Sequence, residues 1–294
     1  MFSDTHFHFQ KMAQQCKNGV EVLSLMAQNN CFFGLDIGTN SDDLLERQSF
    51  CEQTIAQITN HSLAEKVREF LYFSAGIWPD VDSIHDRINK MNELKNQINI
   101  ANQNEDDTLH RKIIAVGECG LDHHWNPSGE DGRDINDFDK KTYEGERELF
   151  QMQIELARKL NLPVIVHSRD AFEDTLDCIN NMNYHNGIIH CYSYGLEEAK
   201  KFLDKGWYIS LSGSVTYTKK SKLEEMNEFL KYIPNDRILC ETDSPYLAPV
   251  PLRGNPNNPT FVEHTYKYVA AARNQSVEEL CHIVDQNIKT LFRI

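Results

Sequence analysis

Six side chains of the kinds that bind divalent metal ions stand at or near the ends of short apolar runs. They are His6, His8, Glu118, His167, His190 and Asp243. Imidazole nitrogens and carboxylate oxygens are common protein ligands of zinc and manganese. Two imidazoles on each side of a bridging carboxylate, with a second carboxylate beside them, suit a pair of ions. We therefore expect a site for two divalent metal ions, with Zn²⁺, Mn²⁺ and Mg²⁺ all open as the native metal.

The first two of these residues lie two positions apart in a strand-like apolar stretch. Residues i and i+2 of a strand point to the same face, so His6 and His8 can aim both imidazoles at one point. Taken singly, each of the six has an ordinary alternative role as a core histidine, a helix cap or a turn residue. The coincidence of six such residues at the ends of different strands favours the metal site.

The apolar runs that carry these residues alternate with helical patterns along the whole chain. Strands are expected at 1–9, 31–38, 70–77, 113–118, 163–167, 187–191, 207–212 and 237–243. Helices are expected at 17–29, 41–59, 82–103, 142–161, 170–182, 195–205, 221–232, 260–273 and 276–291. This alternation predicts an α/β fold, a (β/α)8 TIM barrel with one domain over 1–294, whose strand ends gather the chemistry at one mouth. An open doubly wound sheet is the alternative, and the lack of a Gly-x-Gly-x-x-Gly turn argues against its dinucleotide-binding form.

Composition narrows the class of protein. Of the 294 residues 40% are hydrophobic and 25% charged, which is typical of a globular protein with a sizeable core. No signal-peptide pattern or apolar run of about 20 residues occurs, so we expect a cytoplasmic protein without membrane association. The eight cysteines form no C-x-x-C pair and are expected to be free thiols.

The net charge of −14 argues against a broad basic surface for binding nucleic acid. No feature indicates an obligate protein partner.

Five motifs in chain order resemble the TatD family of metal-dependent deoxyribonucleases, which are amidohydrolase-like metallohydrolases. The motifs are DTHFH at 4–8, GECGLD at 117–122, PVIVHSRDA at 163–171, IHCYS at 189–193 and ETDSPYL at 241–247. Arg253-Gly254, in a loop that ends at Asn258-Pro259, also resembles the family's loop after the eighth strand. The acidic stretch at 82–110 and the polar insertion at 125–141 depart from the family pattern. They leave the substrate preference open.

The resemblance implies a metal-dependent hydrolase that cleaves phosphodiester bonds of DNA, in the manner of an exonuclease acting on chain ends or single strands. Our hypothesis is that His6, His8 and Asp243 hold one ion, that His167 and His190 hold the other, and that Glu118 bridges them. Asp243 is also expected to act as the general base, because a carboxylate there can reach both metal and water. Catalysis would then rest on Asp243 and Glu118.

Residues beside the motifs are candidates for substrate binding. Arg169 and Arg253 are expected to contact phosphates, since a guanidinium pairs with phosphate through two hydrogen bonds. Aromatic residues near strand ends either stack on bases or pack in the core: Trp78, Trp125, Tyr192 and Tyr246. His123 and His124 follow Glu118 closely, and one of them could reach the substrate or the outer shell of a metal.

Two other functions stay open at this point. One is metal-dependent hydrolysis of an amide, lactone or imide in a small molecule. Many such enzymes bridge their metals with a modified lysine on the fourth strand, where this chain has Glu118. The other is a metal-binding protein without turnover, which the complete ligand set disfavours.

Overall fold

Eight parallel strands form the centre of the computed structural model, which describes residues 2–103, 113–124 and 133–294. They follow one another around the sheet in chain order. The strands are β1 (Asp4–Phe7), β2 (Gly34–Asp36), β3 (Leu71–Ala75), β4 (Ile113–Asp122), β5 (Val164–Arg169), β6 (Gly187–Ile189), β7 (Tyr208–Leu211) and β8 (Ile238–Cys240). A parallel bridge between Phe7 and Ser244 brings the chain beyond β8 back to β1. The predicted TIM barrel is confirmed.

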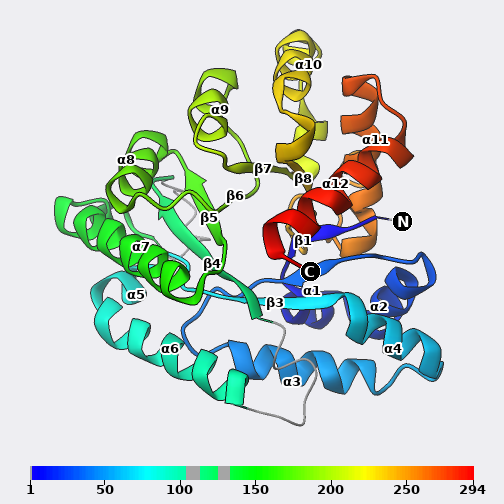
Figure 1. The fold of residues 1–294 in the computed structure, drawn as a ribbon, viewed down its shortest axis with the longest axis horizontal. Coiled ribbons are helices and arrows are strands. Elements are labelled where there is room, and N and C mark those ends of the chain that lie inside the picture. The colour runs from blue at the N-terminus through cyan, green and yellow to red at the C-terminus, as the bar shows by residue number, and fades with distance from the viewer. Residues whose placement is uncertain (1, 104–112, 125–132) are drawn as a thin grey trace.

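Helices surround this ring of strands on the outside (Figure 1). They are α1 (Phe9–Cys16), α2 (Gly19–Gln28), α3 (Leu44–Ile55), α4 (His61–Phe70), α5 (Val81–His85), α6 (Arg87–Gln103), α7 (Lys140–Leu160), α8 (Phe172–Met182), α9 (Leu196–Leu203), α10 (Leu223–Tyr232), α11 (Val262–Arg273) and α12 (Val277–Phe292). None of the helices within the described residues is both long and apolar enough to cross a bilayer.

Three helical regions differ from the sequence-based expectation. The prediction omitted α1, although its buried residues Phe9, Met12 and Ala13 recur at helical spacing. It also omitted α4, which runs directly into β3 without a turn, so that the two apolar patterns merge. The single helix expected at 82–103 is broken at Asp86 into α5 and α6.

The core is built as the continuous apolar runs predict. Side chains buried between strands and helices form one hydrophobic cluster, and the largest of them that are fully buried include Trp207, Tyr266 and Phe33. Burial on both faces explains why the strands show little polar alternation. The assignment of residues 1–294 to one domain stays a prediction.

The carboxyl ends of the parallel strands meet at one mouth of the barrel, and this arrangement positions the site. The two stretches that depart from the family pattern lie partly beyond what can be described: residues 104–110 and 125–132, with Trp125, fall outside the described residues. In the part of the insertion that the structure describes, Arg133 is buried, and its guanidinium donates to Glu146 Oε1 on α7 at 2.9 Å.

Candidate metal centre

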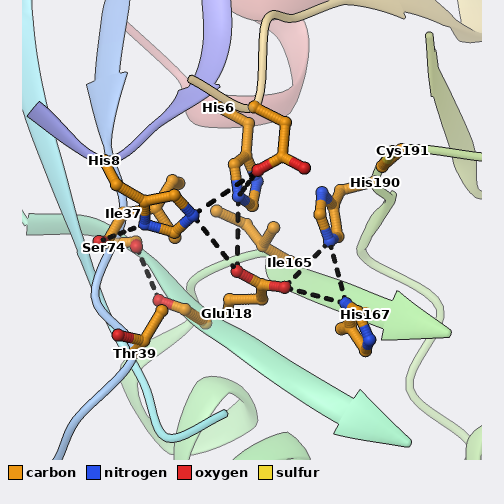
Figure 2. Close-up of polar contacts among 12 residues, drawn as sticks. His6, His8, Ile37, Thr39, Ser74, Glu118, Ile165, His167, His190 and Cys191 are labelled. Atoms are coloured by element: carbon orange, nitrogen blue, oxygen red, sulfur yellow. Dashed lines mark hydrogen bonds and ion pairs between the residues drawn. The ribbon is translucent and has the colours of Figure 1, made fainter. Parts of the chain in front are cut away.

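Glu118 on β4 lies at the centre of a ring of imidazoles (Figure 2). Its Oε1 atom is 2.9 Å from His167 Nδ1 and 3.0 Å from His190 Nε2. Its Oε2 atom is 3.3 Å from His6 Nε2 and 3.7 Å from His8 Nε2. Each carboxylate oxygen therefore faces a different pair of histidines.

Asp243 completes the side of the ring that His6 and His8 form. Its Oδ1 atom is 3.6 Å from His6 Nε2 and 3.5 Å from His8 Nε2. The structure holds Asp243 in place through its backbone, because its N–H donates to the carbonyl of His6 at 2.9 Å. Its φ of 57° lies in the left-handed region, which Asp tolerates better than most residues.

Two sets of three residues offer ligand atoms that all lie within 4.8 Å of one another: His6 with His8 and Asp243, and His6 with Glu118 and His190. His6 belongs to both sets. Its ring stacks on that of His190 with 4.0 Å between centroids. The structure thus brings together all six residues that the sequence singled out as ligands.

Three of the four histidines use their second ring nitrogen to contact an outer acceptor. His8 Nδ1 lies 3.3 Å from the carbonyl of Ile37, His167 Nε2 lies 2.8 Å from Asp122 Oδ2, and His190 Nδ1 lies 3.3 Å from Glu241 Oε1. In metal sites, such outer acceptors fix the tautomer and orient the other nitrogen toward the ion. The arrangement therefore leaves one nitrogen of each of these rings facing Glu118 or Asp243.

Sequence reasoning missed the roles of Asp122 and Glu241, although both stand inside the motifs. Asp122 lies on β4 four residues after Glu118, and Glu241 is two residues before Asp243. Strand periodicity did not reveal them, because the β4 register shifts around Glu118 and Glu241 lies beyond the end of β8. Glu241 is fully buried, and it accepts hydrogen bonds from Ser210 Oγ at 2.5 Å and from the Cys191 N–H at 2.6 Å.

Charges within the ring set its protonation. Burial disfavours an ionised Glu118, but His190 and His167 outweigh it and hold the pKa of Glu118 well below its usual range. Burial disfavours a charged His167, yet Asp122 and Glu118 raise the pKa of His167 to about 9. For His6, burial and the neighbouring His190 lower the pKa, so this ring is neutral near pH 7. The ionised carboxylate of Glu118 and the charged ring of His167 stabilise each other, and a cation that replaced the proton of His167 would interact with the same carboxylate.

His6 provides the clearest sign that the site suits a metal ion. Both of its ring nitrogens are buried, and neither has a hydrogen-bond partner among the described residues. Buried polar atoms in native proteins are almost always hydrogen-bonded, so an unpartnered imidazole points to a ligand of another kind. The donor set of imidazole nitrogens and carboxylate oxygens fits a divalent cation.

The candidate substrate residues occupy different positions. Arg169 ends β5 and is exposed. Arg253 is exposed, and its guanidinium carbon lies 4.1 Å from the ring centroid of Tyr217. Of the two histidines after Glu118, His123 Nε2 lies 3.1 Å from Glu146 Oε2, and His124 Nδ1 lies 2.7 Å from Asp170 Oδ2.

The aromatic candidates separate into core and surface residues. Tyr192 is buried and stacks on Phe229, as the core-packing alternative predicts. Trp78 meets the ring of His167 edge to face at 5.8 Å. Tyr246 is 45% exposed and lies beside His8, with 6.2 Å between ring centroids.

Comparison with known proteins gives a consistent result. A family model described as TatD related DNase matches residues 3–293. The chain is 34% identical over 228 residues to the uncharacterized metal-dependent hydrolase YabD of Bacillus subtilis, covering 77% of this chain and 79% of that protein. It is 34% identical over 189 residues to a protein of Pantoea vagans named 3'-5' ssDNA/RNA exonuclease TatD, covering 62% of this chain and 67% of that one. The crystal structure of the TatD homologue YJJV of Escherichia coli superposes with a TM-score of 0.76 at 22% identity, covering 100% of this chain and 98% of the other.

Proposed function

Because the chain belongs to the TatD family of metal-dependent hydrolases, we propose that it hydrolyses phosphodiester bonds of DNA, acting on single strands or chain ends. The observation that carries the proposal is Glu118, a buried carboxylate whose two oxygens face two different pairs of histidines. A carboxylate in that position suits a bridge between two ions. The name of the Pantoea vagans relative suggests two further properties to test: action on single-stranded nucleic acid, and removal of nucleotides in the 3'-to-5' direction.

In the proposed centre, His6, His8 and Asp243 would hold one divalent ion, His167 and His190 would hold the second, and Glu118 would be shared by both. Bound ions of this kind lower the pKa of water and stabilise charge on phosphate oxygens. Asp122 and Glu241 fix the rings of His167 and His190 through their outer nitrogens.

Asp243 is the proposed general base. Burial disfavours its ionised form, but the hydrogen bond from His8 and the charges of nearby histidines lower the pKa of Asp243 below its ordinary value. Its carboxylate is therefore ionised near pH 7, which is the form that a general base requires. Arg169 and Arg253 are proposed to contact the phosphates of the nucleic acid, since both residues are exposed, one at the end of β5 and the other in the loop after β8.

The test is hydrolysis by purified protein supplied with Mg²⁺, Mn²⁺ or Zn²⁺. Single- and double-stranded DNA labelled at the 5' end would be offered beside a panel of amides and lactones. We expect metal-dependent shortening of the DNA, with faster loss of single strands. Turnover of an amide or lactone with no cleavage of DNA would replace the proposal by the small-molecule alternative.

A further inference from the structure

A group of exposed cations stands out on this acidic chain. Lys219, Lys220 and Lys222 lie within a span of four residues in the segment between β7 and α10, and Arg253 lies in the loop after β8. All four are exposed. The net charge of the whole chain is −14, so a group of four exposed cations contrasts with the overall charge. Local clusters, rather than the net charge, determine where a polyanion binds.

The two loops that carry these cations are joined by specific contacts. The Tyr217 hydroxyl donates to the carbonyl of Ala248 at 2.7 Å, and the Val250 N–H donates to Thr216 Oγ1 at 2.9 Å. The guanidinium of Arg253 lies over the ring of Tyr217, two residues before Lys219. Arg253 and the lysine segment therefore belong to one surface.

Both loops begin at the candidate metal centre. The loop after β7 starts at Ser212, whose Oγ lies 3.1 Å from Cys191 Sγ, and Cys191 follows His190 directly. The loop after β8 contains Asp243, three residues beyond the end of the strand. A strand held at the metal centre would thus meet this cationic surface on the same mouth of the barrel.

The lysines differ in how far carboxylates neutralise them. Lys222 Nζ forms an ion pair with Glu225 Oε2 at 2.6 Å, and Glu224 is two residues after Lys222 in the sequence. No carboxylate among the described residues forms an ion pair with Lys219 or Lys220. The backbone of this segment is ordered as a 3₁₀ turn over Lys220–Lys222, and the Lys222 N–H donates to the carbonyl of Lys219 at 2.8 Å. Within the described part of the chain, two ammonium groups without an ion-pair partner are therefore presented from an ordered backbone.

We propose that Lys219 and Lys220, together with Arg253, bind the phosphate backbone of a single-stranded nucleic acid whose end lies in the metal centre. This proposal rests on the proposed nuclease function and names the part of the substrate beyond the scissile bond. It explains how an acidic protein holds a polyanion: the contact is confined to one side of the mouth. A single strand suits it because its flexible backbone can follow two adjoining loops.

The test compares the double variant K219Q/K220Q with a matched control, K159Q/K231Q. Lys159 and Lys231 are exposed and lie in the last turns of α7 and α10. Those helix ends lie at the opposite face of the barrel, because helices in this fold run antiparallel to the strands. The control therefore removes the same charge at a distance from the mouth.

Binding of a fluorescent 20-nucleotide oligothymidylate would be followed by anisotropy at several KCl concentrations. Each phosphate contact with a single strand contributes a salt slope of about 0.7, so two contacts are worth about 25-fold in affinity at 0.1 M salt. We expect K219Q/K220Q to bind about 25-fold more weakly, with a salt slope reduced by about 1.4. The control should match the wild type. For a nucleotide ester with one phosphate, the loss in kcat/KM should be smaller.

Equal affinities and salt slopes for K219Q/K220Q and K159Q/K231Q would overturn the proposal, as would a wild type that does not bind the oligonucleotide. Binding that depends on Lys219 and Lys220 without any hydrolysis of DNA would support this surface and count against the nuclease function alone. If DNA were hydrolysed equally well with and without both lysines, the nuclease function would be supported and the proposed binding surface would be wrong. The two proposals can therefore fail separately.

Discussion

Replacing Asp122 by Asn should change how the metal affinity of this protein depends on pH. The Asp122 carboxylate lies 2.8 Å from His167 Nε2 and, with Glu118, raises the pKa of His167 to about 9. A metal ion that binds His167 through Nδ1 must displace a proton from this ring. The raised pKa makes that displacement costly at low pH and nearly free above pH 9.

The size of the effect follows from the fraction of neutral ring. A pKa of about 9 leaves His167 neutral in about 0.3% of molecules at pH 6.5 and in about 24% at pH 8.5, a rise of about 75-fold. If the pKa of the variant returned to the ordinary value of about 6.5, the same rise would be about twofold. Glu118 still supports the charged ring, so D122N should fall between these limits. The protonation of the other histidines affects metal binding by the wild type and by D122N alike, so its effect largely cancels when the two proteins are compared.

Loss of the Asp122 carboxylate also leaves the His167 ring less firmly oriented, and the loss of such an outer partner typically costs about 10- to 100-fold in metal affinity. D122N should therefore bind Zn²⁺ clearly more weakly at pH 8.5, with a smaller difference at pH 6.5. Competition with a chromogenic chelator at pH 6.5, 7.5 and 8.5 measures this, with D174N as the control. Asp174 on α8 accepts a hydrogen bond from Arg147 at 2.7 Å and does not contact His167. If the affinities of wild type and D122N rose in parallel with pH, the proposed link between Asp122 and His167 would be wrong.

Three further outcomes are expected. His167→Ala should reduce DNA hydrolysis more than about a hundredfold at saturating metal, because it removes a proposed ligand; wild-type rates in this variant would contradict the ligand assignment. Metal at about 100 times its Kd should stabilise the fold by about 2.7 kcal/mol, seen as a higher Tm than after chelation, whereas an unchanged Tm would argue against a resident metal site. Gly213→Ala should destabilise the protein by about 1–3 kcal/mol in urea unfolding, since an added Cβ would lie 2.2 Å from the carbonyl oxygen of Leu247. At Gly195, the N-cap of α9, the nearest atom is the flexible Glu198 carboxylate at 3.0 Å, so Gly195→Ala is the control without a backbone clash and should cost less than Gly213→Ala.

The barrel was predictable because its signal repeats eight times. Strands buried on both faces read as short apolar runs, and parallel strands require a connection between each pair. The same geometry explains why residues as distant as His6 and Asp243 could be placed together: the carboxyl ends of all strands share one mouth. The prediction missed individual helices such as α4. There Phe70 ends the helix and Leu71 begins β3, with no turn-forming residue between them.

The outer partners of the site were harder to predict because they depend on side-chain direction. Asp122 and Glu241 look like ordinary motif residues until the rings of His167 and His190 are oriented in space. Likewise, the sequence alone does not distinguish Tyr192 from Tyr246 as a residue that could stack on a base. In the structure Tyr192 stacks in the core, whereas Tyr246 is exposed. Such differences arise from tertiary packing, which strand periodicity does not determine.

The most direct test of the central claim is a count of bound metal. Protein purified without chelator, loaded with Zn²⁺ or Mn²⁺ and freed of excess, would be analysed by mass spectrometry of its metal content. The two-ion centre predicts two ions per chain in the wild type and fewer in variants that lack Glu118, the proposed bridge. At most one ion in the wild type, or two ions retained in Glu118→Ala, would contradict it.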